Sequence, residues 1–315
     1  MKRRNDLFYN TIGILITNKC TTECPVCCCS CRKNSSDEIP LKIIFDCINQ
    51  ACNERHIKHI AISGGDPFLR YGDLLSIIAY SKQNGFETSC YTNASWCNSP
   101  ERTQEVVSNL EISGLDTLRI SLDVQHSLHV PLNNYKNLIQ SLRKSKIRTF
   151  INTGVLGNDL LENMNLIKKV GVGGNGVLRY DTQIFPFLRI GDAKKIDDDL
   201  FLKNVCISNL ECPRNPILLI DSCGDAYGCE MCFNKSYRIG NVYRDNLHTI
   251  LKSSQKELYY KAIKKFGLKR IAVAMENSGI NIPFPFVSSC EFCNWVFSNF
   301  DKTEIYGILG ESSFG

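Results

Sequence analysis

Three cysteines lie close together near the N-terminus in the spacing C-x3-C-x2-C, at Cys20, Cys24 and Cys27. They follow residues 11–17, whose alternating pattern predicts a β-strand. Three thiolates on one short loop can hold three irons of a [4Fe–4S] cluster and leave the fourth iron open, whereas a fully ligated cluster takes four cysteines. Three neighbouring cysteines offer other ligands and keep a zinc site open as the alternative: Cys28, Cys29 and Cys31.

A second group of cysteines lies in the C-terminal part of the chain. Its members are Cys206, Cys212, Cys223, Cys229, Cys232, Cys290 and Cys293. The two C-x2-C pairs in this group, 229/232 and 290/293, have the spacing of a structural zinc site. A cysteine that binds no metal often behaves as a small hydrophobic residue, so the members outside a metal site are expected to pack as core residues.

Glycines and polar residues follow three of the predicted strands. The segment SGGDP follows the second strand, Asn93 follows the third, and the segment SLD follows the fourth. In a parallel βα fold the carboxyl ends of the strands meet on one side, where the chemistry takes place. We therefore expect the following residues to lie near the first cysteine loop: Gly64, Gly65, Asp66, Asn93, Ser121 and Asp123.

The elements that must position these residues alternate along the chain. Short apolar stretches at residues 11–17, 57–63, 86–92, 117–122, 147–155 and 177–180 predict six strands. Stretches with helical spacing separate them, as in βαβ units with a parallel sheet. Six units predict an α/β fold in the form of a partial (β/α)6 barrel rather than a complete eight-unit barrel.

The chain of 315 residues is long enough for about two domains. The βα pattern ends near Arg189, and residues 191–200 are polar and acidic. We predict a barrel over residues 1–190 and a small cysteine-rich domain over residues 191–315, with one or two helices at residues 246–266.

The composition excludes several classes of protein. Hydrophobic residues at 43% and charged residues at 22% are typical of a globular chain. A net charge of +5 is too small to indicate nucleic-acid binding, and no apolar run approaches the roughly 20 residues of a membrane span. The N-terminus lacks a signal-peptide pattern, which predicts a cytosolic protein. There, 17 cysteines favour metal binding over disulfides.

Taken together, the first cysteine loop and the strand-end residues resemble the radical S-adenosylmethionine (SAM) superfamily. The resemblance implies that Cys20, Cys24 and Cys27 hold a [4Fe–4S] cluster whose open iron binds SAM. It also implies that the backbone at Gly64–Asp66 meets the SAM amino group. The other strand-end residues, Asn93, Ser121 and Asp123, would meet its carboxylate and ribose.

The later cysteines resemble the auxiliary-cluster domains called SPASM and twitch. Cys212, Gly224 and Cys229 match the pattern C-x(9–15)-G-x4-C, and residues 239–242 (IGNV) resemble the segment that follows it. One closing C-x2-C pair fits the shorter twitch form with a single auxiliary [4Fe–4S] cluster. The ligands implied by this resemblance are Cys212, Cys229, Cys290 and Cys293.

Three local segments resemble radical SAM peptide epimerases in particular: TNASW ending at Trp96, DVQH ending at His126, and residues 282–293. Such enzymes take the Cα hydrogen from an L-residue of a ribosomally made precursor peptide, and a cysteine returns hydrogen from the opposite face. In those relatives the donor cysteine directly follows a cluster ligand, whereas here Glu230 follows Cys229. The predicted donor is Cys232, with Cys223 as the alternative.

Other reactions stay open at this stage. Thioether or carbon–carbon crosslinking of a peptide is the leading alternative to epimerisation, followed by dehydrogenation or rearrangement of a small molecule. A zinc-stabilised protein without catalysis, including one that binds nucleic acid, would leave Gly64–Asp66, Asn93 and Ser121–Asp123 unexplained. The expected partners are a precursor peptide and an electron donor such as flavodoxin or ferredoxin, with no membrane and no nucleic acid.

Overall fold

The computed structural model describes residues 9–172, 180–212, 217–231, 237–256 and 258–310. Six parallel strands form the N-terminal part of one sheet. They are β1 (Thr11–Leu15), β2 (His59–Ser63), β3 (Glu87–Thr92), β4 (Thr117–Ser121), β5 (Arg148–Val155) and β6 (Tyr180–Pro186). The α/β class and the partial (β/α)6 barrel expected from the sequence are confirmed.

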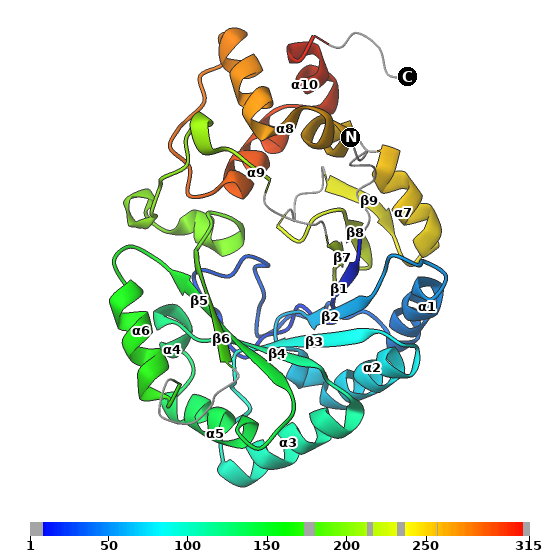
Figure 1. Ribbon diagram of the computed structural model, residues 1–315, viewed down its shortest axis with the longest axis vertical. Helices are drawn as coiled ribbons and strands as arrows, with labels where there is room; N and C mark the ends of the chain where they lie inside the picture. Colours follow the sequence, from blue (N-terminus) through cyan, green and yellow to red (C-terminus); the bar gives the residue numbers. More distant parts are fainter. Residues whose placement is uncertain (1–8, 173–179, 213–216, 232–236, 257, 311–315) are drawn as a thin grey trace, which may run out of the picture.

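Helices cover the outer face of these strands, as Figure 1 shows. They are α1 (Leu41–Ala51), α2 (Tyr71–Gln83), α3 (Pro100–Ser113), α4 (Val124–Ser127), α5 (Leu132–Leu142) and α6 (Leu160–Lys169), with the 3-10 helix η1 (Pro67–Arg70) before α2. Four isoleucines of β1 and β2 are almost fully buried beneath them: Ile12, Ile14, Ile60 and Ile62. Burial of such a side chain contributes about 1.5–3 kcal/mol, so the apolar strand pattern drives this packing.

The sixth strand extends further than the sequence predicted. It was predicted at residues 177–180, but residues 173–179 lie outside the described part of the chain and β6 runs from Tyr180 to Pro186. Its register is set by β5, because Thr149 pairs with Tyr180 and Val155 pairs with Pro186. Most of its side chains are exposed, so it carries no apolar pattern that sequence reasoning could detect.

The C-terminal region continues the same sheet. Strand β7 (Leu218–Ile220) pairs in parallel with β1, and β8 (Asp225–Tyr227) and β9 (Arg238–Asn241) follow as antiparallel strands. Four helices lie beyond them: α7 (Leu247–Lys256), α8 (Leu258–Asn277), α9 (Ser289–Asn299) and α10 (Lys302–Ile308). Figure 1 shows α8, α9 and α10 gathered at one end of the molecule, opposite α3 and α5.

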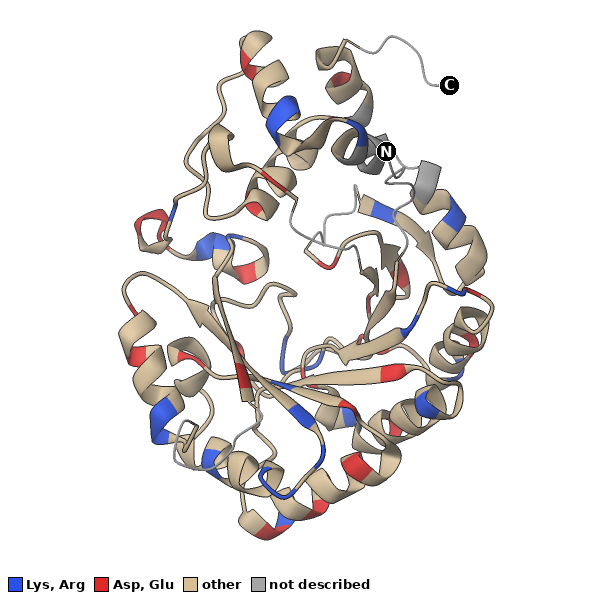
Figure 2. Ribbon diagram, viewed as in Figure 1, with Lys and Arg blue, Asp and Glu red and all other residues tan. Residues whose placement is uncertain are grey.

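Three short 3-10 helices connect the two parts: η2 (Gly191–Lys195), η3 (Asp198–Leu200) and η4 (Ile207–Asn209). Figure 2 shows that positively and negatively charged residues are interspersed along the outer helices. Within the described ranges, no helix is both long enough and apolar enough to cross a membrane.

Candidate active site

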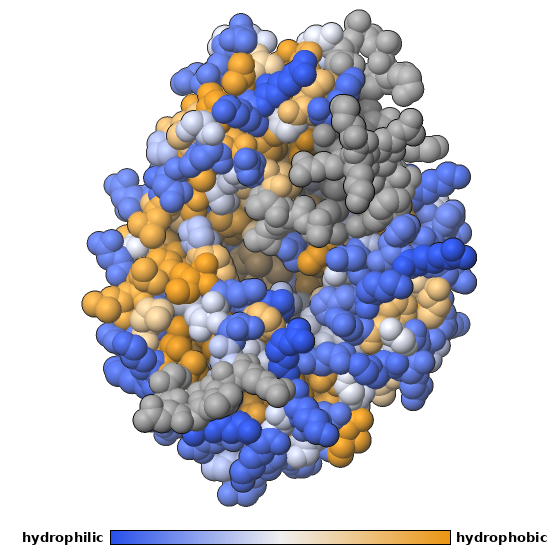
Figure 3. Space-filling model, viewed as in Figure 1, coloured by the Kyte–Doolittle hydropathy of each residue, from blue (hydrophilic) through white to orange (hydrophobic). Residues whose placement is uncertain are grey.

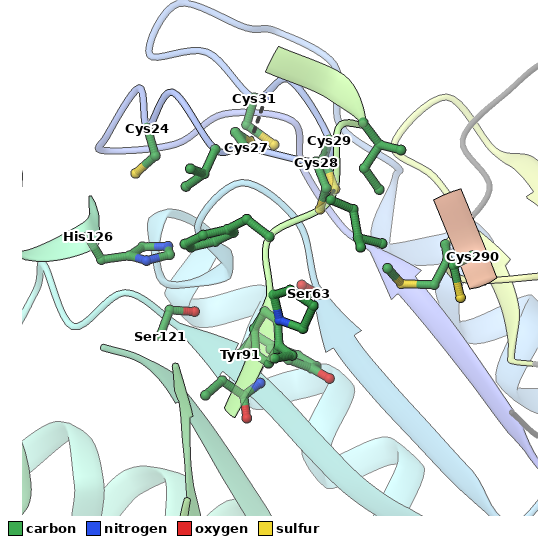
Figure 4. Close-up of a pocket in the computed structure, with 18 of the residues that line it drawn as sticks. Cys24, Cys27, Cys28, Cys29, Cys31, Ser63, Tyr91, Ser121, His126 and Cys290 are labelled. Atoms are coloured by element: carbon green, nitrogen blue, oxygen red, sulfur yellow. Dashed lines mark hydrogen bonds between the residues drawn. The ribbon is translucent and has the colours of Figure 1, made fainter. Parts of the chain in front are cut away.

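A cavity of about 630 Å³ lies at the carboxyl ends of the barrel strands. Figure 3 shows the surface hollowed at this place, between the barrel and the C-terminal region. Predicted site residues from both regions share its wall: Cys20, Cys24, Cys27, Gly64, Gly65, Asn93, Ser121 and Cys290. The structure therefore brings together residues that are up to 270 positions apart in the sequence, as Figure 4 illustrates.

The first cysteine loop presents its thiols on one compact turn. The Sγ atoms of Cys20 and Cys24 lie 3.4 and 3.3 Å from the same hydroxyl oxygen of Thr22. The amide of Cys27 donates to the carbonyl of Cys24 at 3.1 Å, and the amide of Cys31 donates to the Cys27 sulfur at 3.4 Å. These bonds hold the three predicted ligands on one wall of the cavity.

Burial keeps these thiols neutral when no cation is near. It raises the pKa of Cys20, and it raises the pKa of Cys24 to about 11. A bound metal would supply the positive charge that stabilises thiolates there. Among the described residues, no three His, Cys, Asp or Glu side chains converge as ligands of one metal ion. Cys20, Cys24 and Cys27 all line one cavity of about 630 Å³, and three cysteines on such a wall are the ligand set of a [4Fe–4S] cluster with one open iron.

The two glycines after β2 allow their loop to pack against the cysteine loop. A Cβ atom on Gly65 would lie 2.1 Å from the carbonyl oxygen of Lys19, well inside contact distance. The Gly65 amide donates to the carbonyl of Thr17 and the Asp66 amide to that of Lys19, both at 2.8 Å. Only glycine permits this approach, which places Gly64 and Gly65 on the cavity wall.

Asp66 lies behind the wall rather than on it. Its carboxylate is 1% exposed and accepts bonds from the hydroxyls of Thr21 and Ser95 and from the Phe68 amide. Burial raises the pKa of this carboxyl group. The Asn93 amide donates to the Thr21 hydroxyl at 3.0 Å, so this network joins the ends of β2 and β3 to the cysteine loop.

Asp123 is also buried behind the wall, and it presents a histidine to the cavity. Both of its oxygens lie 2.9 Å from Nδ1 of His126, and one accepts the amide of Gly154 at 3.2 Å. His126 lines the cavity, whereas Asp123 is 1% exposed. The sequence signal for this pair is an Asp and a His three residues apart after a strand. It contributed to the resemblance to peptide epimerases, but it did not by itself predict that His126 lies at the site.

Asn152 is a second cavity residue that sequence reasoning missed. It pairs with Ser121 across β4 and β5, and both side chains line the cavity. Its Oδ1 atom is buried and has no hydrogen-bond partner among the described residues. An acceptor left in this state fits a ligand that donates an N–H or O–H group. The only sequence signal was an asparagine within a predicted strand.

Two polar contacts bring the segments of the second cysteine group together. The amide of Glu211, next to Cys212, donates to the Ser289 hydroxyl at 3.2 Å, next to Cys290. Asn294 donates to the carbonyls of Met231 and Cys290 at 2.9 and 3.0 Å. The chain segments that carry the predicted auxiliary ligands therefore adjoin one another.

The predicted ligands in this group differ in burial. Cys212 is exposed, Cys229 and Cys290 are half-buried, and Cys293 is buried. The Tyr237 hydroxyl donates to the Cys293 carbonyl at 2.8 Å, which fixes the start of α9. Of the four, Cys290 lines the cavity.

The predicted hydrogen donors do not lie on the described wall of the cavity. Cys232 falls outside the described residues. Cys223 is exposed in the turn between β7 and β8, where its amide donates to Asp221 at 2.9 Å and its carbonyl accepts from Asn241. Cys206 is exposed at the start of η4.

Comparison with known proteins gives one family and several relatives. The family model described as the radical SAM superfamily matches residues 14–180, which is more than half of the chain. The Bacillus subtilis (strain 168) protein YydG, whose name assigns it to peptide biosynthesis, is 23% identical and the match covers 95% of this chain and 96% of that protein.

Two solved structures show the same fold. Native anSMEcpe with bound AdoMet superimposes with a TM-score of 0.60 at 12% identity, over 95% of this chain and 97% of that one. Streptococcus suis SuiB bound to S-adenosylmethionine gives a TM-score of 0.56 at 14% identity, over 82% of this chain and 68% of that one.

Proposed function

The chain belongs to the radical SAM superfamily, and from this premise we propose that it converts an L-residue of a ribosomally made precursor peptide to the D form. The observation that carries the proposal is the shared cavity: the Cys20–Cys27 loop forms one part of its wall, and Cys290 of the second cysteine group forms another. A carbon radical formed there would be enclosed by protein and close to thiols.

Family membership implies SAM and a [4Fe–4S] cluster, and the residues of the cavity fit both groups. Cys20, Cys24 and Cys27 would hold the cluster. The cavity wall at Gly64, Gly65, Asn93 and Ser121 would hold SAM, and the unpartnered oxygen of Asn152 is available to accept from it. When bound, these groups supply a carbon-centred radical that removes a hydrogen atom.

The chain's own side chains keep this region dry and ordered. Val26, Phe187 and Val287 line the cavity and are each less than 10% exposed. Apolar walls exclude water, which would otherwise compete for reactive intermediates. The carboxylate of Asp123 holds His126 in one orientation toward the same space.

Two relatives support a peptide as substrate. The name of YydG assigns that protein to peptide biosynthesis, and its sequence similarity extends over almost the whole of both chains. A structure of anSMEcpe holds both AdoMet and a peptide, and it shares this fold with a TM-score of 0.59 at 13% identity over 95% of this chain and 99% of that one.

We propose that Cys212, Cys229, Cys290 and Cys293 bind one auxiliary [4Fe–4S] cluster. The contacts from Glu211 to Ser289 and from Asn294 to Met231 support this set, because they bring the four ligand segments together. A small electron-transfer protein such as flavodoxin or ferredoxin would supply electrons.

Oxidative crosslinking of the peptide is the second candidate, and one observation favours it. Removal of two electrons from a substrate is usually accompanied by loss of a proton to a base. A histidine whose Nδ1 is held by a buried carboxylate is the arrangement of a general base, and His126 presents such a ring to the cavity.

Coexpression with a candidate precursor peptide, sought among the short reading frames beside the gene, separates these reactions. Epimerisation leaves the peptide mass unchanged in ordinary water, adds one deuterium at the altered Cα in heavy water, and gives a D-residue on chiral amino-acid analysis. A product two hydrogens lighter would replace epimerisation with crosslinking or dehydrogenation. A peptide unchanged in mass, deuterium content and chirality would overturn the proposed substrate.

A further inference from the structure

We propose that the Cys28–Cys29 thiol pair returns the hydrogen atom to the peptide. The inference rests on the proposed epimerisation and names its catalytic thiols. It follows from where the structure places the cysteines that are not predicted cluster ligands.

Both thiols face the cavity that contains the first cysteine loop and Cys290. The Sγ atoms of Cys28 and Cys29 are 3.6 Å apart. In Figure 4 the pair lies between Cys27 and Cys290, with Tyr91 and Ser63 below. A peptide in the cavity would therefore meet these thiols between the two cysteine groups.

The loop that carries the pair is held from behind by η2. A Cβ atom on Gly191 would lie 2.3 Å from the Cys27 carbonyl and 2.4 Å from the Cys28 carbonyl, so the loop packs directly on this glycine, whose φ is +59°. The Asp192 amide donates to the Cys27 carbonyl at 2.9 Å. Arg32 donates to both oxygens of Asp192, at 2.5 and 2.8 Å, and this ion pair attaches the C-terminal end of the loop to η2.

A second cavity, of about 820 Å³, also borders the pair. Cys28 and Cys29 line both cavities, and polar side chains such as Arg189 and Lys194 line the second one. Water that reaches the second cavity can exchange the thiol hydrogen. This is what a donor needs if it is to deliver solvent hydrogen to a radical in a dry site.

The other described thiols meet these conditions less well. Cys223 is exposed in the turn between β7 and β8, away from the cavity wall. Cys31 lines the cavity, but it is only 3% exposed and its amide is bonded to the Cys27 sulfur.

The step balances in atoms and electrons. A peptide Cα radical takes a hydrogen atom from one thiol: a C–H bond forms, an S–H bond breaks, and a sulfur radical remains on the protein. One electron from a reduced flavodoxin or ferredoxin and one proton from water restore the thiol. The second thiol, 3.6 Å away, can pass its own hydrogen atom to the sulfur radical, which moves the radical to the second sulfur without changing the balance.

Alkylation of the anaerobic holoenzyme tests whether the pair binds metal. Iodoacetamide followed by peptide mass spectrometry should label Cys28 and Cys29 while the cluster ligands stay protected. Protection of this pair until the iron is removed would overturn the inference, because a sulfur that binds metal has no hydrogen atom to give.

Variants test the donation itself, with the precursor peptide that the wild-type enzyme epimerises in the coexpression experiment as the probe. In the double variant Cys28→Ala/Cys29→Ala, the ratio of D-residue to 5′-deoxyadenosine should fall about tenfold or more. Cys52→Ala removes an exposed thiol at the end of α1 and should leave that ratio unchanged.

Three results would overturn the inference. A ratio in Cys28→Ala/Cys29→Ala equal to that of the wild type would remove the pair as donor but leave epimerisation intact. Loss of D-residue in Cys232→Ala with full solvent deuterium incorporation in the double variant would assign the role to Cys232. A wild-type enzyme that makes no D-residue would overturn both the inference and the epimerase proposal. The wild-type measurement therefore distinguishes failure of the epimerase proposal from failure of the donor assignment alone.

Discussion

The two cysteine groups are positioned by different kinds of structure. The first lies on a loop after β1 and is bonded to the ends of β2 and β3 through Thr21, Asp66 and Asn93. The second depends on loops and helix starts, such as the contacts between residues 211 and 289 and between residues 231 and 294. Both groups use contacts between residues more than 60 positions apart, so sequence separation does not distinguish them.

The two groups differ in whether a general rule of folding brings their residues together. Wherever the βα pattern recurs, parallel strands place their carboxyl ends on one face, so motifs that follow the strands lie near one another. No comparable rule brings residue 212 to residue 290. The first group should therefore tolerate changes in the C-terminal region beyond η2, whereas the second should depend on contacts between distant segments within that region.

The largest expected effect comes from removing the first group. The triple variant Cys20→Ala/Cys24→Ala/Cys27→Ala should lose all SAM cleavage and about half of the bound iron, because each proposed cluster holds four irons. Iron analysis and chromatography of 5′-deoxyadenosine measure the two effects. Cys52→Ala is the matched control, and formation of 5′-deoxyadenosine by the triple variant would contradict the site.

Removal of one ligand from the second group sharpens the comparison. Cys293→Ala or Cys212→Ala should lose about the other half of the iron while the first cluster persists, and solubility should fall because metal binding and folding are linked. Cys206→Ala is the control, since its exposed thiol lies in η4. Equal loss of iron from Cys206→Ala or Cys223→Ala would show that the ligand assignment is wrong.

A glycine substitution tests the close packing that supports the first group. In Gly65→Ala the new Cβ would meet the Lys19 carbonyl, which should destabilise the fold by about 2 kcal/mol or more and weaken SAM binding. Gly72→Ala places a Cβ in open space in α2 and should unfold at the same or a higher urea concentration. Equal urea midpoints for the two variants would contradict the packing argument.

The smallest expected effect is a pH dependence at the link between the first loop and η2. The Arg32 guanidinium holds the pKa of Asp192 at about 2, below the ordinary value near 4. Because the pKa of Asp192 is lower in the folded protein than in the unfolded chain, the ionised carboxylate stabilises the fold at pH values above the unfolded-state pKa. This stabilisation is lost as the pH falls from about 4 toward 2. In Asp192→Asn, the melting temperature should therefore change less with pH over that range than it does in the wild type. An unchanged slope would show that the ion pair adds nothing there.

Much of the barrel was predictable, and the exceptions have physical causes. Five of the six strands were placed well because buried strands are apolar, as the isoleucines of β1 and β2 show. The end of the sixth was predicted too early, because β6 is mostly exposed and takes its register from β5. The junction of β7 with β1 was missed because a three-residue strand carries too little pattern to reveal its partner.

The site was predictable in composition more than in geometry. Asp66 and Asp123 were expected near the first cysteine loop, and the structure adds that both are buried behind the cavity wall, where they hold neighbouring groups. His126 and Asn152 face the cavity. The sequence signal for each was weak, because a single polar residue near a strand end occurs for many other reasons. Only the packing of β4 and β5 shows which polar side chains share the space.

The sequence by itself determined the family, the barrel and the candidate ligands of the first cluster, because these depend on local spacing and on a strand rule that holds across parallel βα folds. The tertiary structure decided which thiols face one cavity. Cys28 and Cys29 were extra cysteines on a loop until Gly191 and Asp192, some 160 residues later, were seen to pack behind that loop. Such an approach depends on how distant segments fill space, and no local pattern of residues records it.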